Sequence, residues 1–147
     1  MNNVYNVVYL FTPELDKVLL VFKERGPNVG KLNGVGGGMK NIDSAGCPNI
    51  DFIHDVRRSA QREVGEETGA YIGMENLHYL YKEEIPNGEL WIFYATIKMD
   101  RIHQIEDEQL AWQNINSILY IEPENEKYFA PNTIKHIQDA YVKLGGG

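Results

Sequence analysis

The sequence predicts a single domain of the α/β class, an α+β sandwich in which a central mixed β-sheet lies between helices. Three observations carry this prediction: strand-like runs of β-branched and aromatic residues, two later segments with apolar residues at helical spacing, and a glycine-dense stretch before the first of these helices. With 147 residues and 43% hydrophobic residues, the chain fits one domain with a sizeable core. We place this domain at residues 1–144 and expect residues 145–147, all glycine, to form a flexible tail.

A β-hairpin is expected at the start of the chain. Residues 4–11 and 18–22 are rich in β-branched and aromatic side chains, and residues 12–17 between them have the composition of a turn. Residues 26–38 are dense in glycine, so we expect a loop there that contains at most a very short strand. Residues 41–50 continue as irregular chain with small and polar side chains.

The first helix is predicted at about residues 52–67. Asp51 is a good N-cap, apolar residues then recur at helical spacing, and Gly69 stands where a C-terminal helix glycine belongs.

The second half of the chain is expected to hold a second hairpin and a terminal helix. Residues 77–85 and 89–98 have strand character and are joined through Pro86-Asn87-Gly88, and Asn-Gly between apolar runs is a strong hairpin signal. A further short strand is predicted around residues 109–112, and an amphipathic helix from Pro131 to Leu144.

Charge and cysteine content exclude several classes of protein. A net charge of −7 argues against general affinity for duplex nucleic acid, which requires a basic surface. Cys47 is the single cysteine, so an intrachain disulfide is excluded, and the four histidines show no zinc-like spacing. No run approaches the roughly 20 apolar residues of a membrane span, and no signal segment is recognisable, so a reduced, cytoplasmic compartment is the default expectation.

Three carboxylates, Glu63, Glu66 and Glu67, share one face near the C-terminal end of the predicted helix. Like charges at this spacing repel one another, and the helix macrodipole disfavours anions at this end. A bound cation would relieve both effects, and a compact group of carboxylates suits Mg²⁺ or Mn²⁺. The alternative is a solvated acidic face, which is the commoner explanation for an isolated pattern of this kind.

The sequence around these acids resembles the downstream half of the Nudix box. The matching residues are Arg62, Glu63, Val64, Glu66, Glu67, Gly69 and Ala70. The upstream half departs from the family pattern, because His54 stands at the position of a glutamate and residues 41–50 form an insertion of about ten residues. In the family that glutamate helps to hold the arginine, so Asp51 or Asp55 are the candidates to replace it.

The glycine-rich segment 29–38 is not a P-loop, because the spacing of its glycines and lysine does not match that motif. It is not a dinucleotide-binding fingerprint either, because that motif requires a helix directly after the glycines and none is expected here. It resembles the corresponding segment of MutT-like Nudix enzymes. That resemblance implies base recognition by Asn33 and close approach of Gly37 and Gly38 to phosphates. Lys31 and Arg25 are either phosphate contacts or solvated loop charges. Glu108 is the favoured fourth carboxylate, as a metal ligand or base, with a solvated acidic loop as the alternative.

The resemblance implies Mg²⁺-dependent hydrolysis of a pyrophosphate bond in a nucleoside diphosphate-linked small molecule. The favoured substrate is a nucleoside triphosphate, including oxidised purine forms, which would yield the monophosphate and pyrophosphate. Dinucleoside polyphosphates, ADP-ribose and NAD-type compounds stay open as substrates. A catalytically weak domain that binds a nucleotide or a protein stays open as well, and family habit leaves a homodimer open.

Overall fold

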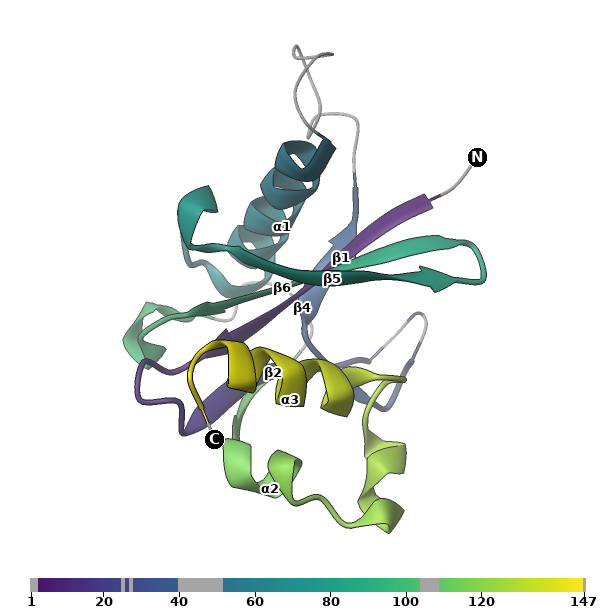
Figure 1. The fold of residues 1–147 in the computed structure, drawn as a ribbon, viewed down its shortest axis with the longest axis vertical. Coiled ribbons are helices and arrows are strands. Elements are labelled where there is room, and N and C mark those ends of the chain that lie inside the picture. The colour runs from purple at the N-terminus through teal and green to yellow at the C-terminus, as the bar shows by residue number, and fades with distance from the viewer. Residues whose placement is uncertain (1–2, 25, 27, 40–51, 104–108, 147) are drawn as a thin grey trace.

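A seven-stranded mixed sheet forms the centre of the protein, with α1 (Phe52–Thr68) on one face and α3 (Thr133–Lys143) on the other (Figure 1). The computed structural model describes residues 3–24, 26, 28–39, 52–103 and 109–146. This layered arrangement confirms the predicted α+β sandwich.

The strands of the sheet follow the order β3-β2-β1-β6-β5, and β4 also pairs with β1 while β7 pairs with β2. Their bounds are β1 Asn3–Phe11, β2 Lys17–Phe22, β3 Leu32–Asn33, β4 Val35–Gly38, β5 His78–Ile85, β6 Gly88–Thr96 and β7 Gln109–Asn114. The central pair, β1 and β6, is parallel along the full length of both strands. Both predicted hairpins, β1–β2 and β5–β6, are confirmed as antiparallel pairs.

The glycine-rich segment contains two short strands rather than at most one. β3 pairs with the end of β2, and β4 then pairs with the first half of β1 from Val8 back to Tyr5. β1 and β2 pair with each other only at Leu10–Leu19 and Phe11–Val18, so the edge of β1 before this point is available to β4. Long-range pairing therefore makes a strand from a sequence that has low strand propensity.

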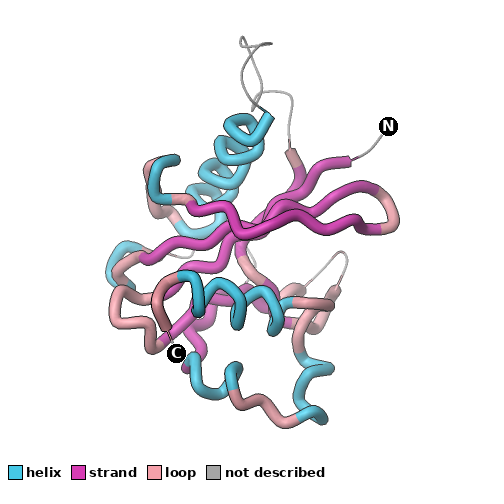
Figure 2. The backbone as a smooth tube through the Cα atoms, viewed as in Figure 1, coloured by secondary structure: helices cyan, strands magenta, loops and turns pink. Residues whose placement is uncertain are grey.

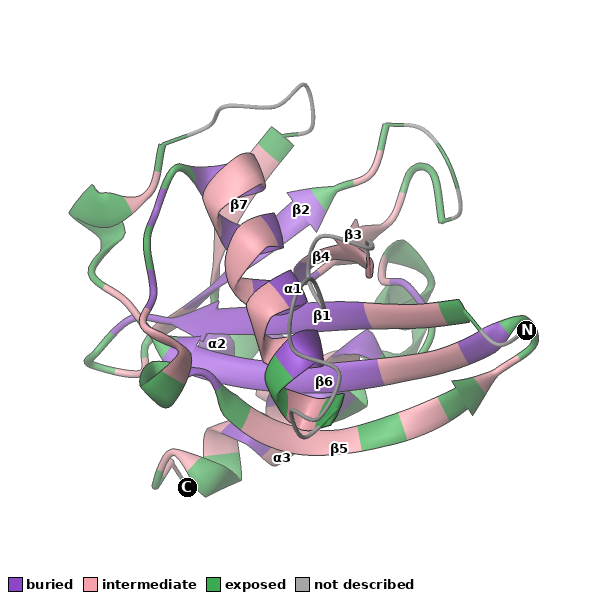
Figure 3. Cartoon of the chain, turned by 90° about the horizontal axis from the view of Figure 1, so that it is seen from above, coloured by how far each residue is buried: buried purple, intermediate pink, exposed green. Residues whose placement is uncertain are grey.

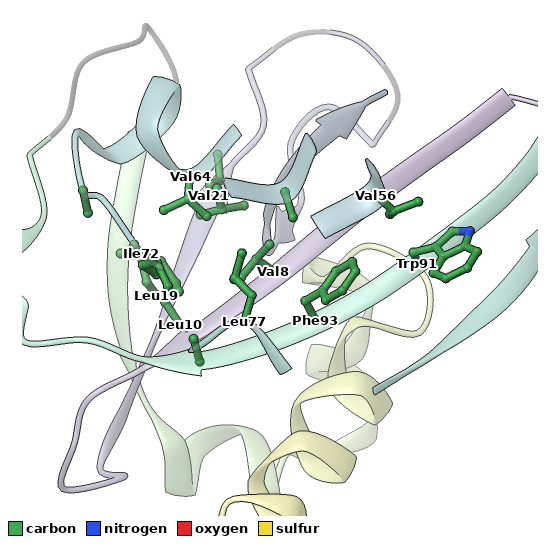
Figure 4. Close-up of a cluster of buried hydrophobic side chains, with 14 residues drawn as sticks. Val8, Leu10, Leu19, Val21, Val56, Val64, Ile72, Leu77, Trp91 and Phe93 are labelled. Atoms are coloured by element: carbon green, nitrogen blue, oxygen red, sulfur yellow. The ribbon is translucent and has the colours of Figure 1, made fainter. Parts of the chain in front are cut away.

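The sheet separates two hydrophobic cores, because successive residues of β1 point to opposite faces. Val8 and Leu10 face α1, whereas Val7, Tyr9 and Phe11 face α3. Figure 3 shows the buried middle of β1 and β6 beneath α1, and Figure 4 shows the side chains of the core between α1 and the sheet.

Helix α1 matches its prediction to within one residue. Its residues Val56, Ala60 and Val64 recur every four positions and are fully buried against the sheet. Gly69 has a φ of +76°, and its N–H donates to the carbonyl of Gly65, as expected for a C-terminal helix glycine.

The remaining helices are short (Figure 2). α2 (Ile115–Leu119) packs against α3, and three 3₁₀ helices lie at Met74–Asn76, Met99–Arg101 and Pro123–Tyr128. The sequence did not predict these four elements, since none is long enough to show a helical period. The predicted terminal helix begins at Thr133, two residues after Pro131, and the predicted strand at 109–112 is β7. Among the described helices, none has the length and apolar character needed to cross a bilayer.

Candidate functional site

The C-terminal half of α1 lies directly against β4, where the strand consists of glycines. Glu63 and Glu67 stand one helical turn apart and are each only 8% exposed. The N–H of Gly36 donates a hydrogen bond of 3.0 Å to Oε2 of Glu67. A Cβ atom at Gly37 would lie 2.6 Å from Cδ and Oε1 of Glu63. The absence of side chains at Gly36 and Gly37 is therefore what lets both carboxylates reach the backbone of the sheet.

Arg62 connects this acidic face to the strand. Its Nη1 donates to Oε1 of Glu63 at 2.9 Å and to Oε1 of Glu66 at 3.1 Å, and its Nη2 donates to the carbonyl oxygen of Gly38 at 3.1 Å. One guanidinium thus contacts two carboxylates and the backbone of β4. The arginine also reduces the repulsion among the acids that the sequence pattern implies.

Neither His54 nor Asp55 takes the place of the missing upstream glutamate as a partner of Arg62. His54 is exposed, and Asp55 is buried but pairs with Arg58 at 3.8 Å rather than with Arg62. Asp51, the other candidate, lies outside the described residues, as do residues 41–50. The Gly38 carbonyl is a contact of Arg62 that the sequence did not indicate.

The three carboxylates differ in their surroundings. Glu63 and Glu67 lie beneath the helix against β4, whereas the Glu66 side chain is 39% exposed at its edge. Arg62 lies between Glu63 and Glu66. Within the described part of the chain, no group of three or more His, Cys, Asp or Glu side chains is arranged to hold a metal ion. The metal centre read from the sequence therefore stays a prediction.

The structure places the predicted substrate contacts along the glycine-rich segment. Asn33 lies on β3, and its Oδ1 accepts hydrogen bonds from the N–H of Gly34 at 2.8 Å and from Oγ1 of Thr133 at 3.3 Å. Lys31 is half-buried, and its N–H donates to the carbonyl of Asn28. Arg25 and Glu108 lie outside the described residues. Gly37 and Gly38 are brought together with Arg62 and the acids, whereas the Asn33 side chain contacts the start of α3.

A polar stripe that the sequence did not indicate lies on the buried side of α1. Asp55, Ser59, Glu63 and Glu67 recur every four residues and all are buried. Asn6 of β1 faces this stripe, and its Nδ2 donates to Oγ of Ser59 at 2.8 Å. The available signal was Asn6, a polar residue among the β-branched and aromatic side chains of residues 4–11.

A second missed cluster lies between the sheet and α3. The hydroxyl of Tyr9 is 2.9 Å from Nδ1 of His136, and Nε2 of His136 is 2.8 Å from Oε1 of Glu83. Burial lowers the pKa of His136 despite the nearby Glu83 carboxylate, and burial raises the pKa of Tyr9. Beside them, burial and a hydrogen bond to Asp139 raise the pKa of Tyr81 to about 12. Nothing in the local sequence indicates this cluster, because its members are far apart in the chain.

The α+β sandwich of this chain also occurs in solved structures of other proteins. Neither protein-family models nor curated protein sequences match the chain. Among solved structures, the Nudix domain of Shewanella oneidensis NrtR, determined with ADP ribose, matches with a TM-score of 0.71 at 18% identity over 98% of this chain and 89% of that chain. A MutT Nudix hydrolase from Burkholderia pseudomallei matches with a TM-score of 0.67 at 17% identity over 95% and 98% of the two chains.

A MutT/Nudix family protein from Enterococcus faecalis matches with a TM-score of 0.62 at 22% identity over 78% of this chain. The match covers 44% of that protein, so this chain spans less than half of its length. The chain has the Nudix fold shared by these MutT-like proteins, which confirms the resemblance read from the sequence.

Proposed function

We propose that the protein is a Mg²⁺-dependent pyrophosphohydrolase that cleaves a nucleoside diphosphate-linked small molecule, with a nucleoside triphosphate as the favoured substrate. The observation that carries the proposal is the burial of Glu63 and Glu67 against the backbone of β4. Carboxylates are costly to bury, so two of them on one buried helix face indicate a role beyond stability. The Nudix fold of the chain supports the same activity.

The carboxylates at this site have the ligand chemistry that a hard divalent cation prefers, although the described side chains are not gathered around one point. Glu63 and Glu67 would hold it, since both offer carboxylate oxygens on one face of α1, and Glu66 would join them from the edge of the helix. Glu108 is proposed as a fourth ligand or as the base. Mn²⁺ is proposed as an alternative ion. When bound, the cation supplies positive charge that neutralises the phosphates and makes a water molecule more acidic.

The remaining roles belong to side chains of the protein. Glu66, the most exposed of the three helical carboxylates, or Glu108 would accept the proton of the attacking water. Arg62 holds Glu63 and Glu66 in place through the contacts described above. Lys31 and Arg25 would contact phosphate oxygens, and Asn33 would contact the nucleobase. Gly37 and Gly38 would allow the substrate to approach the backbone of β4.

The test is a comparison of Glu67→Gln with Glu14→Gln in a Mg²⁺-dependent hydrolysis assay over a panel of nucleotides. Glu67→Gln keeps the shape of the side chain but removes its charge, so we expect turnover to be lost while the melting temperature changes little. Glu14 is exposed in the turn after β1, and its substitution is expected to change neither property. Wild-type turnover in Glu67→Gln would contradict the metal assignment.

A nucleotide-binding module without strong catalytic activity is the second candidate. Two observations favour it: Arg62 lies between Glu63 and Glu66, and the matching NrtR domain was determined with ADP ribose. The same panel separates the two functions, because a binder would be stabilised thermally by one nucleotide, ADP-ribose or NAD-type compound and would hydrolyse none of them. A homodimer and a cytoplasmic location stay predictions.

A further inference from the structure

A cavity of about 350 Å³ lies at the end of the sheet where β5 begins and β6 ends. Figure 1 shows this end of the sheet, which the 3₁₀ helices Met74–Asn76 and Met99–Arg101 adjoin. Thr96 of β6 lines the cavity and pairs with the last residue of β1, whereas Gly37 at the candidate site pairs with Asn6. These two points on β1 are five residues apart, or about 16 Å, so the cavity is separate from the candidate site.

The walls of this cavity are held in place by the fold. Ile72, which is only 5% exposed, belongs to the core beneath α1, and the half-buried Ile97 packs against that core. Nε2 of Gln61 donates to the carbonyl of Ile72 at 2.8 Å. The N–H of Ile97 donates to the carbonyl of Phe11, also at 2.8 Å. The cavity thus has an apolar floor on a fixed backbone, so little ordering is needed when a ligand binds.

Two cationic side chains lie on the same side of the short helix that forms one wall. Lys98 directly precedes this 3₁₀ helix, and Arg101 is its last residue. Residues three apart in a 3₁₀ helix lie one above the other, and both side chains line the cavity. Asp100 and Glu75 belong to the two short helices, but neither lines the cavity. Among the described residues, none that lines it is Asp or Glu, although the chain has a net charge of −7.

Lys98 and Arg101 have no partner within the part of the chain that the structure describes. Neither side chain makes a hydrogen bond or an ion pair there, and both residues are exposed. Like charges at this spacing repel each other, and a bound anion would relieve the repulsion. Asn76 and His78 also line the cavity, and their side chains likewise make no hydrogen bond among the described residues. The cavity therefore presents positive charge and N–H donors to a ligand.

We propose that this cavity is a second binding site, which takes a small anion that carries phosphate groups. The planar guanidinium of Arg101 can donate two parallel hydrogen bonds to one phosphate, and the Lys98 ammonium adds a point charge. Two adjacent cations match the double charge of a phosphate better than the single charge of a carboxylate. A volume of about 350 Å³ is at the lower end for ligand sites, so it suits pyrophosphate or a nucleoside monophosphate. This site goes beyond the proposed function, since none of these residues belongs to the candidate site.

Titrations followed by the amide NMR signals of isotopically labelled protein test the proposed site with inorganic pyrophosphate, AMP and acetate. EDTA is present throughout and the ionic strength is held constant, so that no divalent cation brings phosphates to the carboxylates of α1. We expect pyrophosphate or AMP to shift the signals of Gly73, Asn76, Lys98 and Arg101 to saturation, whereas acetate does not. Comparison of AMP with pyrophosphate shows whether a phosphate ester or a free phosphate is preferred.

The Lys98→Gln/Arg101→Gln double variant removes the two cations, and Lys127→Gln/Lys143→Gln is the matched control. Both double variants change the net charge by the same amount, and all four side chains are exposed, so folding should be unaffected. We expect the Kd of the bound probe to rise about 10-fold or more in the cavity variant. In the control it should change by no more than about 2-fold, because neither lysine lines the cavity and general charge effects are screened by salt.

Three results would overturn the proposed site. The first is a wild-type protein in which neither phosphate probe shifts the cavity signals to saturation. The second is an equal rise of Kd in both double variants, which would show that overall charge alone is responsible. The third is acetate binding as tight as that of pyrophosphate and AMP. Because hydrolysis is not measured and no divalent cation is present, these results do not depend on whether the proposed pyrophosphohydrolase activity is found.

Discussion

The glycines of β4 allow the contact between α1 and the sheet to be tested one residue at a time, beginning with Gly36→Ala. A Cβ at Gly36 would overlap with the carbonyl oxygen of Asn6 and lie 2.9 Å from Cα of Val7. Both neighbours are main-chain atoms of the central strand, so neither can rotate away. Overpacking of this kind destabilises by about 3 kcal/mol, which for a chain of this size lowers the melting temperature by roughly 6–12 °C.

Gly37→Ala is expected to damage the site more than the fold. Its Cβ would lie 2.6 Å from Oε1 of Glu63 and 2.8 Å from Oε2, but this carboxylate is the far end of a flexible side chain. Glu63 can therefore turn away at a cost of about 1 kcal/mol. That rotation breaks the 2.9 Å contact with Arg62 and displaces a proposed metal ligand. A displacement of about 1 Å can lower turnover on the order of 100-fold.

Gly38→Ala provides the matched control for stability on the same strand. A Cβ there would meet only the ring of Tyr5, at an ordinary contact distance of 3.7 Å. Alanine is about 0.5 kcal/mol more favourable than glycine within a strand, so stability should stay level or rise slightly.

Thermal unfolding and Mg²⁺-dependent nucleotide hydrolysis are measured for all three variants. The expected pattern is loss of stability in Gly36→Ala, loss of turnover with nearly intact stability in Gly37→Ala, and intact stability in Gly38→Ala. If Gly37→Ala keeps the turnover of the wild-type protein, Glu63 does not act from the position against β4.

Two further predictions concern stability. Burial lowers the pKa of His136, so the unfolded chain binds more protons below about pH 6.5 and the free energy of unfolding should fall as the pH drops through that value. Urea unfolding at pH 7.5 and at pH 5.5 measures this fall in the free energy of unfolding. The His136→Gln variant should lose less stability between these two pH values than the wild-type protein. An equal loss in both proteins would show that His136 is not the cause. Gly69 has a φ of +76°, so Gly69→Ala should lower the free energy of unfolding by about 1 kcal/mol. Gly69→Asn should lower it less, because asparagine adopts the left-handed conformation more readily than alanine. Equal losses of the two variants in thermal unfolding would show that the left-handed conformation is not the cause.

Features set by neighbouring residues in the chain were predictable from the sequence. The period of the apolar residues and the glycine at position 69 placed α1 to within one residue, and Asn87-Gly88 located the β5–β6 hairpin. The parallel pairing of β1 with β6 was not predictable, because the two strands are more than 70 residues apart and no local pattern specifies their register. The pairing of β4 with β1 depends on the same long-range arrangement.

The candidate site also has features that the sequence predicted and features that it did not. Helical spacing placed Glu63, Glu66 and Glu67 near one another, and the helical period suffices for that. The anchoring of Arg62 by the Gly38 carbonyl and the burial of Glu67 beneath the N–H of Gly36 follow from where β4 lies, so no sequence pattern could indicate them. The contact between Tyr9 and His136 joins residues 127 positions apart and was equally inaccessible.

The arrangement of α1 on β4 explains how the fold tolerates buried acids at this one place. An ordinary strand would present side chains here, and a carboxylate packed against them would lose its hydration without gaining hydrogen bonds. β4 presents bare backbone instead, so Glu67 receives the N–H of Gly36 and Glu63 shares Arg62 with the Gly38 carbonyl. Glycine in a strand is itself unfavourable relative to alanine, as is the clustering of acids at a helix C-terminus. Stability alone would favour replacing both features, and the proposed cation site would account for the two together.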